Sequence, residues 1–530
     1  MSSYNKLNGE YTQQSHDLLT KVLRDDWGYD GIVMTDWGAK AGTIKAVQAG
    51  NDLMEPGNQV EIQRIIDAVQ DGSLSEADLD RNVRRMLEYI VKTPHFRHYA
   101  FSNAPDLKAH AALAREAAGE SIVMLRNEDH TLPIRANGQK VALYGVTSLD
   151  FVAGGTGSGN VNKAYVVNMV DALTGAGFQV DRAITNFYEA YMSYNRAMAG
   201  LSGAVRGASI LGTSKESDPA VPRSAIDAHA QNDDLAVIVI GRNAGEGADR
   251  RMDNDFNLTD IERQLLSDVS QAFHEKGKKV IVVLNIGGVI ETNSWKYLAD
   301  AILLPWSPGQ EGANAVADII TGKVNPSGKL PMTFPINFSD HPSSANFPYN
   351  YVRTATTGRG PAQPRKNVDY TDYAEGIWVG YRYFDTNERM VSYPFGFGLS
   401  YTTFAYSKPV IKAGPDGFTA SVTVTNTGSV AGREAVQLYV SAPAGGLEKP
   451  AHELKAFAKT RELAPGESQT LTMRVSAYEL ASFNEAANQW ETAAGTYRIG
   501  FGASVADIRA TAQFRQAKVR TFAVSPAWVD

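Results

Sequence analysis

Four short runs of apolar residues, separated by segments with helical spacing, constrain the fold of this chain most strongly. The runs lie at residues 141–144, 235–240, 280–284 and 301–304. Strands this apolar are buried on both faces, and a parallel sheet with helices on both sides provides that environment. The helical spacing over residues 258–274, with Thr259 or Asp260 near the N-cap, is typical of a covering helix. The sequence therefore predicts an α/β sandwich with a mostly parallel sheet.

The hydrophobic pattern differs on either side of this region. Apolar and polar residues alternate at residues 418–428, 435–440, 471–475 and 495–500, which predicts a β-sandwich after residue 403. The first 95 residues instead alternate between helix and strand. We expect a helix over 14–27, a strand over 32–35, and a helix that Ser75 caps and Pro94 ends.

The predicted strand over residues 32–35 ends in a carboxylate, Asp36, which the indole of Trp37 follows. In parallel α/β architectures the carboxyl ends of the strands carry the chemistry. A carboxylate can attack the anomeric carbon of a sugar, and an aromatic side chain can pack on the sugar ring. The pair therefore indicates carbohydrate chemistry. The alternative is that Asp36 only caps the turn that follows it.

The composition of the 530-residue chain argues against several other classes. A net charge of −7 does not favour nucleic acid or an anionic membrane as a partner. There is no cysteine, and the nine histidines form no His-x-x-x-His pair, so we expect no metal site of His or Cys, while carboxylate-only sites stay open. No apolar run reaches 18 residues and residues 1–5 lack a signal-peptide core, which leaves cytoplasmic, periplasmic and secreted locations open.

Several motifs resemble those of glycoside hydrolase family 3. Ser3-Tyr4-Asn5 and Thr35-Asp36-Trp37 are similar to a late part of that family's catalytic barrel, and stretches at 328–335, 373–385 and 393–402 follow in the family's order. The resemblance covers nearly the whole chain. The domains it implies are the C-terminal portion of a (β/α)8 barrel at 1–95, a linker at 96–111, an α/β sandwich domain at 112–335, an extended linker at 336–402 and a fibronectin type III-like domain at 403–520.

The same resemblance implies roles for three residues near the first carboxylate. Asp36 falls on the position of the family's nucleophile, Trp37 on a neighbouring substrate-stacking position, and Tyr4 on a tyrosine that borders the nucleophile in the sugar subsite. The implied activity is that of a retaining, exo-acting β-glucosidase, which releases the terminal sugar of a β-glucoside or oligosaccharide through a covalent glycosyl-aspartate. No cofactor is expected, because two carboxylates suffice.

Glu246 is the best candidate for the second carboxylate. It lies in the glycine-rich segment 241–250, directly after the apolar run 235–240 and so at the carboxyl end of a predicted strand. The segment resembles a family motif whose glutamate is the acid/base in related β-glucosidases. Proton donation near neutral pH requires a raised pKa, which burial beside a sugar could supply. The alternative is a solvated acid paired with Arg250, and we expect Asp249 and Arg250 to hold the loop.

Residues 154–160 form another glycine-rich loop. Neither the spacing of a dinucleotide-binding fingerprint nor the Gly-Lys-Ser/Thr ending of a phosphate-binding loop is present, so phosphate binding is only weakly indicated. In the family the corresponding segment lies near the sugar, and Ser158 falls on the position of a substrate-contacting serine. The alternative is a flexible turn.

The sequence departs from the family pattern in one respect. In the family, the residues that bind the non-reducing terminal sugar lie on earlier barrel strands, which are absent from this sequence. An incomplete barrel also leaves parallel strand edges unpaired. We therefore expect this chain to be one piece of a larger enzyme, completed by a missing N-terminal barrel segment or a second polypeptide, with a homo-oligomer also open. The other functions considered are a β-xylosidase, a non-catalytic sugar-binding or scaffold fragment, and a β-N-acetylhexosaminidase. The last is disfavoured, because that branch commonly uses a His–Asp dyad and often lacks the C-terminal domains.

Overall fold

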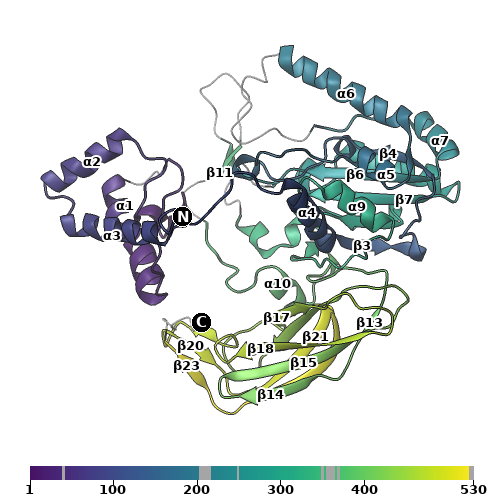
Figure 1. Cartoon of the computed structure of the whole chain (residues 1–530). Coiled ribbons are helices and arrows are strands. Elements are labelled where there is room, and N and C mark those ends of the chain that lie inside the picture. The colour runs from purple at the N-terminus through teal and green to yellow at the C-terminus, as the bar shows by residue number, and fades with distance from the viewer. Residues whose placement is uncertain are drawn as a thin grey trace. The chain divides into compact units, whose positions relative to one another are not determined.

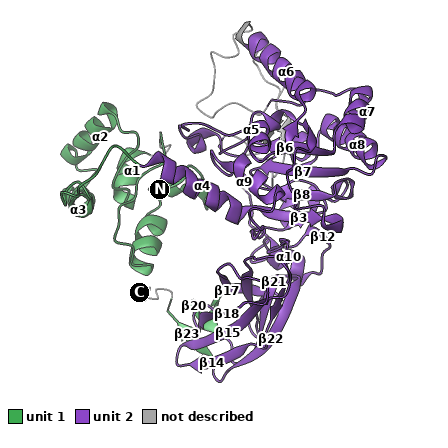
Figure 2. Cartoon of the chain, turned by 45° about the vertical axis from the view of Figure 1, so that its right-hand side comes forward, with its two compact units in different colours: residues 1–105, 481–492, 519–530 green, residues 106–480, 493–518 purple. Residues whose placement is uncertain are grey.

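The computed structural model describes residues 1–38, 42–201, 216–246, 250–347, 351–353, 364–366 and 371–523. The chain divides into two compact units, which Figure 2 shows in different colours. The first unit comprises Met1–Pro105, Ala481–Thr492 and Val519–Asp530, and the second comprises Asp106–Leu480 and Ala493–Lys518. Asp36 therefore belongs to the first unit and Glu246 to the second.

Helices dominate the N-terminal part of the first unit (Figure 1). They are η1 (Thr12–Gln14), η2 (Asp17–Asp26), α1 (Thr43–Ala49), α2 (Gln59–Gln70) and α3 (Glu76–Lys92), and a hairpin of β1 (Lys6–Leu7) and β2 (Glu10–Tyr11) precedes them. The cap predicted for α3 is confirmed, because the Ser75 hydroxyl accepts a hydrogen bond from the Asp78 amide at 3.1 Å. The helix ends at the C-cap Thr93, directly before Pro94.

The helix predicted over residues 14–27 is shorter in the structure and is wound differently. It spans Asp17–Asp26 as a π-helix, and the amide of Trp27 donates to the carbonyl of Val22 at 3.0 Å. Its buried Leu19 packs with Val33 and Ala49 in a small core. The helix therefore covers the segment that leads to Asp36.

Three extended segments lie side by side around Asp36. Isolated parallel bridges join Ser2 to Thr35 and Met34 to Leu53. The strand predicted over residues 32–35 is reduced to these bridges at Met34 and Thr35, because neither neighbouring segment stays in register with it for longer. The Asp36 segment lies between two parallel neighbours, as a strand of a (β/α)8 barrel does.

A six-stranded sheet forms the centre of the second unit, in the order β3-β8-β7-β6-β4-β5. The strands are β3 (Val123–Asn127), β8 (Ala301–Leu304), β7 (Lys279–Ile286), β6 (Leu235–Arg242), β4 (Lys140–Tyr144) and β5 (Gln179–Val180). All neighbours are parallel except β3 and β8, which are antiparallel. The prediction of an α/β sandwich with a mostly parallel sheet is confirmed.

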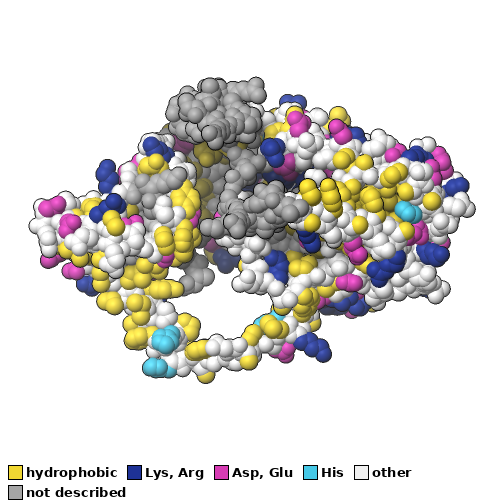
Figure 3. Space-filling view, turned by 90° about the horizontal axis from the view of Figure 1, so that it is seen from above, with side chains coloured by type: hydrophobic (Ala, Val, Ile, Leu, Met, Phe, Trp, Pro, Cys, Tyr) yellow, Lys and Arg dark blue, Asp and Glu magenta, His cyan; other side chains and the backbone are white. Residues whose placement is uncertain are grey.

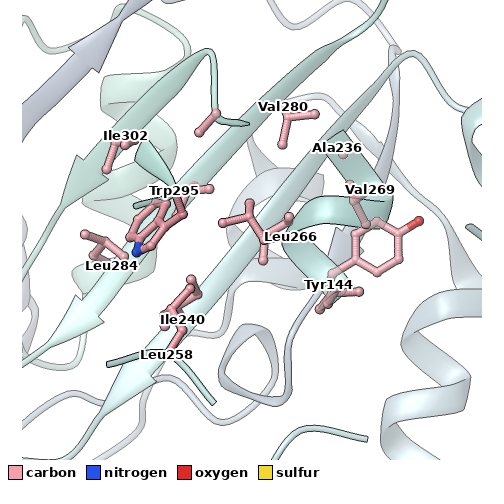
Figure 4. Packing of buried hydrophobic residues seen from close by; sticks show 14 of the residues in the cluster. Tyr144, Ala236, Ile240, Leu258, Leu266, Val269, Val280, Leu284, Trp295 and Ile302 are labelled. Atoms are coloured by element: carbon pink, nitrogen blue, oxygen red, sulfur yellow. The ribbon is translucent and has the colours of Figure 1, made fainter. Parts of the chain in front are cut away.

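Helices cover both faces of this sheet. The helices are α4 (Leu107–Ser121), α5 (Met169–Gly175), α6 (Arg182–Leu201), α7 (Arg223–Asn232), α8 (Asp260–His274) and α9 (Gly312–Ile320). Residues of α6, α7 and α8 share one buried cluster with the sheet, which Figure 4 shows around Leu266 and Trp295. Residues of α4, α5 and α9 share the other cluster. Burial on both faces explains why the four strand-forming runs are apolar at every position.

Helix boundaries refine two of the sequence expectations. The helix α8 begins with a capping box in which the side chains of Thr259 and Glu262 bond each other's amides, so Thr259 is the N-cap. The helix α4 begins at Leu107 after its cap Asp106, so a helical turn occupies the end of the segment 96–111 that was expected to be a linker.

The C-terminal region of the second unit is a β-sandwich, as predicted. One sheet contains β13 (Phe404–Tyr406), β14 (Val410–Gly414), β15 (Gly417–Asn426) and β18 (Ser468–Ser476), and the other contains β16 (Ala435–Ser441), β17 (Glu453–Lys459), β21 (Gly495–Ser504) and β22 (Asp507–Gln516). Buried side chains of both sheets, among them Val422 and Leu438, form one core. A separate small sheet of β19 (Ser482–Asn484), β20 (Gln489–Thr492) and β23 (Arg520–Phe522) belongs to the first unit.

Short elements complete the described part of the chain. They are η3 (Glu128–His130), η4 (Val146–Ser148), η5 (Gly157–Gly159), η7 (Met252–Phe256), η8 (Lys296–Leu298), β9 (Phe334–Pro335), η9 (Phe338–Asp340), η10 (Pro342–Ala345), β10 (Tyr351–Arg353), β11 (Pro364–Lys366), α10 (Tyr381–Thr386) and β12 (Val391–Tyr393). No helix among the described residues is long and apolar enough to cross a membrane.

Candidate active site

Asp36 lies at the carboxyl end of the central parallel segment of the first unit. Its amide donates to the carbonyl of Ser2 at 3.1 Å, which continues the pairing between these two segments. Its Oδ1 accepts a hydrogen bond from the amide of Trp37 at 2.7 Å, so the capping contact considered as the alternative does form. The other oxygen, Oδ2, has no hydrogen bond to any described residue. One carboxylate oxygen is thus held and the other is left for a ligand.

Two aromatic side chains lie next to this carboxylate. The hydroxyl of Tyr4 donates to the carbonyl of Trp37, which joins the first extended segment to the turn after Asp36. The side chains of Tyr4 and Trp37 are 40% and 57% exposed. Exposed aromatic rings beside a carboxylate offer an apolar face to a sugar ring.

A buried carboxylate, Asp52, fixes the segment that carries Asp36. Its Oδ2 accepts hydrogen bonds from the amide of Val33 at 2.9 Å and from the guanidinium of Arg24 at 2.8 Å, and Arg85 lies 3.4 Å from Oδ1. Arg24 also donates to the carbonyl of Gly31 at 2.8 Å. Burial lowers the pKa of Arg24, and the negative charge of Asp52 opposes this shift. Sequence reasoning missed Asp52, because nothing in its neighbourhood reveals a partner 28 positions away.

Glu246 lies on the loop after β6, at the carboxyl edge of the sheet in the second unit. The hydroxyl of Ser158, on η5, donates to its Oε1. Next to this contact the amide of Thr156 donates to the carbonyl of Ala244 at 2.9 Å, within a parallel bridge from Thr156 to Gly245. The two glycine-rich loops predicted to lie near a sugar are therefore joined through both backbone and side chain.

Glycines permit this close approach of the two loops. Gly245 has φ = +153°, and a Cβ built there would lie 2.3 Å from the Oγ1 of Thr156. Gly157 has φ = +66°, and its Cβ would lie 2.7 Å from the Cβ of Glu246. A larger residue at either position would strain the backbone and push the loops apart.

Two arginines fix the ends of the loop that carries Glu246. At the strand end, the guanidinium of Arg242 binds both oxygens of Glu262 at 2.6 and 2.7 Å and donates to the carbonyl of Asp255 at 2.9 Å. At the other end, Arg250 binds the carboxylate of Asp255 at 2.8 Å and the carbonyl of Val289 at 3.1 Å. The pairing of Glu246 with Arg250, considered as the alternative, does not form between these two described residues. Asp249 lies outside the described residues.

The structure therefore groups the predicted site residues into two sets. Tyr4, Asp36 and Trp37 lie together in the first unit, and Ser158 and Glu246 lie together in the second. Sequence reasoning overlooked Arg242, Asp255 and Glu262. Only Glu262 could have been found, because its spacing from Thr259 is typical of a capping box. Within the described ranges no three His, Asp or Glu side chains are grouped to hold a metal ion.

Chemically, each set contributes one acid. Asp36 supplies a carboxylate with a free oxygen next to aromatic rings, which suits a nucleophile for a sugar. Glu246 supplies a carboxyl group that a neighbouring hydroxyl positions at the carboxyl edge of the sheet, where it can exchange a proton with a bound sugar.

Comparison with known families identifies three regions. A model of the glycosyl hydrolase family 3 C-terminal domain matches residues 122–401, a model of the family 3 N-terminal domain matches residues 1–89, and a model of the fibronectin type III-like domain matches residues 434–505.

Among curated proteins, an exo-α-(1→6)-L-arabinopyranosidase from Bifidobacterium longum is 35% identical over 526 residues, which cover 96% of this chain and 62% of the relative. The thermostable β-glucosidase B of Acetivibrio thermocellus is 33% identical over 517 residues, with the same coverages of 96% and 62%. The chain thus spans less than two thirds of the length of these relatives. Among solved structures, β-glucosidase 3B from Thermotoga neapolitana in complex with α-D-glucose is 40% identical, with a TM-score of 0.89 over 98% of this chain and 72% of that one.

Proposed function

Because this chain belongs to glycoside hydrolase family 3, we propose that it supplies both catalytic acids of a retaining, exo-acting β-glucosidase. The observation that carries the proposal is the placement of Asp36 at the carboxyl end of a parallel segment, with Tyr4 and Trp37 beside it. The β-glucosidases among the similar proteins, one of them solved with glucose bound, support glucose as the sugar.

In the first step an oxygen of Asp36 attacks the anomeric carbon of the terminal sugar. The bond from that carbon to the leaving oxygen breaks, and its electron pair goes to the leaving oxygen, which takes the proton of the Glu246 carboxyl group. The products of this step are a glycosyl ester of Asp36 and a free alcohol. The hydrogen bond from the Trp37 amide to Oδ1 orients the carboxylate, so that Oδ2 can act as the attacking atom.

In the second step Glu246, now a carboxylate, takes a proton from a water molecule. The oxygen of that water attacks the anomeric carbon, the ester bond to Asp36 breaks, and the sugar leaves with its original configuration. The Ser158 hydroxyl donates to Glu246, and we propose that it also reaches the sugar. Trp37 and Tyr4 would pack against the ring.

A second candidate substrate is a pentopyranoside. The arabinopyranosidase of Bifidobacterium longum is 35% identical to this chain, against 33% for the β-glucosidase B of Acetivibrio thermocellus, and L-arabinopyranose lacks the hydroxymethyl group of glucose. A β-xyloside differs from a glucoside in the same way. Because the acids and the aromatic residues act on the ring and the anomeric carbon, they would serve either sugar.

We also propose that further barrel elements complete the sugar site. Apolar side chains of α2 and α3 are exposed on the first unit, among them Ile62, Val83 and Leu87, and Figure 3 shows apolar side chains gathered on the surface of this unit. A cavity of about 520 Å³ lies between these helices. Strands and helices of a (β/α)8 barrel, on whichever polypeptide carries them, would cover this face.

The proposed function is tested by hydrolysis of 4-nitrophenyl β-D-glucoside, with the anomer of the released glucose followed by NMR. The same assay with 4-nitrophenyl α-L-arabinopyranoside and β-D-xyloside tests the pentopyranoside candidates. Assayed together with the barrel elements that complete the sugar site, the unsubstituted chain should release β-glucose first, and Asp36→Asn should be inactive. Asp25→Asn is the matched control, because Asp25 is an exposed acid on η2 whose side chain makes no hydrogen bond or ion pair with another described residue.

Release of α-glucose first, or full activity of Asp36→Asn, would contradict the proposed mechanism. No hydrolysis by the unsubstituted chain in that assay would contradict the proposed β-glucosidase activity and would favour a non-catalytic sugar-binding fragment.

A further inference from the structure

We infer that Asp255, held between Arg242 and Arg250, is a positioning residue for the proton donor Glu246. The inference rests on the proposed function and deepens it by adding a residue that positions the proton donor. Its basis is that one aspartate binds the residues at both ends of the loop that carries Glu246.

The loop is short and its two ends converge on the same residue. Arg242 and Arg250 each lie four positions from Glu246, one on either side. The Nε of Arg242 donates to the backbone carbonyl of Asp255, and the Nε of Arg250 donates to its Oδ1. The other carboxylate oxygen accepts the amide of Arg251 at 2.9 Å. Asp255 therefore closes the base of the loop through three separate hydrogen bonds.

Both arginines are in turn fixed to the sheet and its covering helix. Arg242 is buried and makes its bidentate contact with Glu262, which belongs to the capping box of α8. Arg250 donates to the carbonyl of Val289, and a Cβ at Gly288 would lie 2.4 Å from its Nη1. The loop is thus connected to rigid elements at each end, while Glu246 at its middle is exposed.

If Asp255 positions Glu246, its loss should affect proton donation more than the stability of the fold. A proton donor displaced by about 1 Å loses efficiency by roughly 100-fold. The loss matters only where the leaving oxygen needs a proton, since a sufficiently acidic phenol leaves as its anion without one. Disturbing Asp255 should therefore impair substrates with poor leaving groups selectively, whereas a smaller folded fraction would impair all substrates equally.

The test compares kcat/KM for methyl β-D-glucoside and 2,4-dinitrophenyl β-D-glucoside, because kcat/KM reports the first step alone. For Asp255→Asn we expect a loss of about 10- to 100-fold with the methyl glucoside and of less than about 3-fold with the dinitrophenyl glucoside. Gly288→Ala, which displaces the guanidinium of Arg250 without touching Asp255, should show the same selectivity. Asp253→Asn is the matched control, since Asp253 is an exposed acid two positions away whose side chain makes no hydrogen bond or ion pair within the described part of the chain.

The outcomes separate the positioning role of Asp255 from the proposed function. A selective loss in both Asp255→Asn and Gly288→Ala, with Asp253→Asn unchanged, supports the inference. Equal losses on both substrates, or no loss, in an active chain would overturn the positioning role and leave the proposed function intact. An unsubstituted chain inactive toward both glucosides, even together with the barrel elements that complete the sugar site, would overturn the proposed function and, with it, a role for Asp255 in proton donation.

Discussion

Asp52 is the residue on which the Asp36 segment depends most for its position. Its carboxylate is fully buried and faces the buried guanidinium of Arg24. Removing one partner of a buried ion pair leaves the other charge uncompensated, so Asp52→Ala should lower the free energy of unfolding by about 3–5 kcal/mol in urea titrations. Asp78→Ala removes a half-exposed pair with Arg81 and should cost at most about 1 kcal/mol. Similar losses in the two variants would contradict the importance assigned to Asp52.

Asp233 should make the stability of the second unit depend on pH. Burial, together with the nearby carboxylate of Asp181, raises the pKa of Asp233 from 3.8 to about 7. The folded state thus binds the proton more tightly than the unfolded chain, and the free energy of unfolding should decrease as pH rises from about 4 to about 7. Asn resembles the protonated acid, so Asp233→Asn should match the parent chain only below about pH 4 and should exceed its melting temperature by a growing margin from pH 5 to pH 8. Equal melting temperatures at pH 8 would contradict the raised pKa.

The sequence revealed single residues only where their neighbours formed a pattern. Asp36 could be found because an apolar run leads directly to it, and Ser75 because acids and helical spacing follow it. Arg24 and Asp52 have no such context, since the two become neighbours only after the chain has folded. Asp255 lies near Arg250 in the sequence, but no motif marks that spacing.

The joined loops at the carboxyl edge of the sheet depend on glycine. Gly245→Ala would place its Cβ 2.3 Å from Thr156, so we expect the loop with Glu246 to separate from the loop with Ser158. Activity on a β-glucoside should fall by at least about 10-fold, while the melting temperature changes by only a few degrees because no core side chain is altered. Gly159→Ala, for which a Cβ meets nothing within 4 Å, should have a clearly smaller effect. Equal effects of the two substitutions would contradict this account of the loops.

Helices and strands were predictable where a single sequence pattern determined them. The four apolar runs gave β4, β6, β7 and β8 nearly to the residue, and helical spacing with caps gave α3 and α8. The antiparallel direction of β3 was not predictable, because an edge strand of either direction needs the same apolar residues. The π-helical winding of η2 was not predictable either, because its apolar residues are spaced as they would be in an α-helix.

The order of the hydrophobic patterns along the sequence predicted the order of the domains. Buried parallel strands and period-two strands predicted the α/β sandwich and the β-sandwich, and the family resemblance identified the alternating helices and strands before them as a barrel portion. The three matched family regions follow the same order. The catalytic assignment needed the family resemblance in addition, because Asp36 and Glu246 belong to different units and no local pattern connects them.

The central claim is that Asp36 forms a covalent bond to the sugar, and mass spectrometry after incubation with 2,4-dinitrophenyl 2-deoxy-2-fluoro-β-D-glucoside tests it most directly. The fluorine slows both steps, and the activated leaving group restores the rate of the first step only, so a glycosyl ester should accumulate. We expect one fluoroglucosyl group per chain, located by peptide mapping at Asp36 and absent from Asp36→Asn. A fluoroglucosyl group on another residue, or turnover of the reagent without any covalent adduct, would contradict the claim.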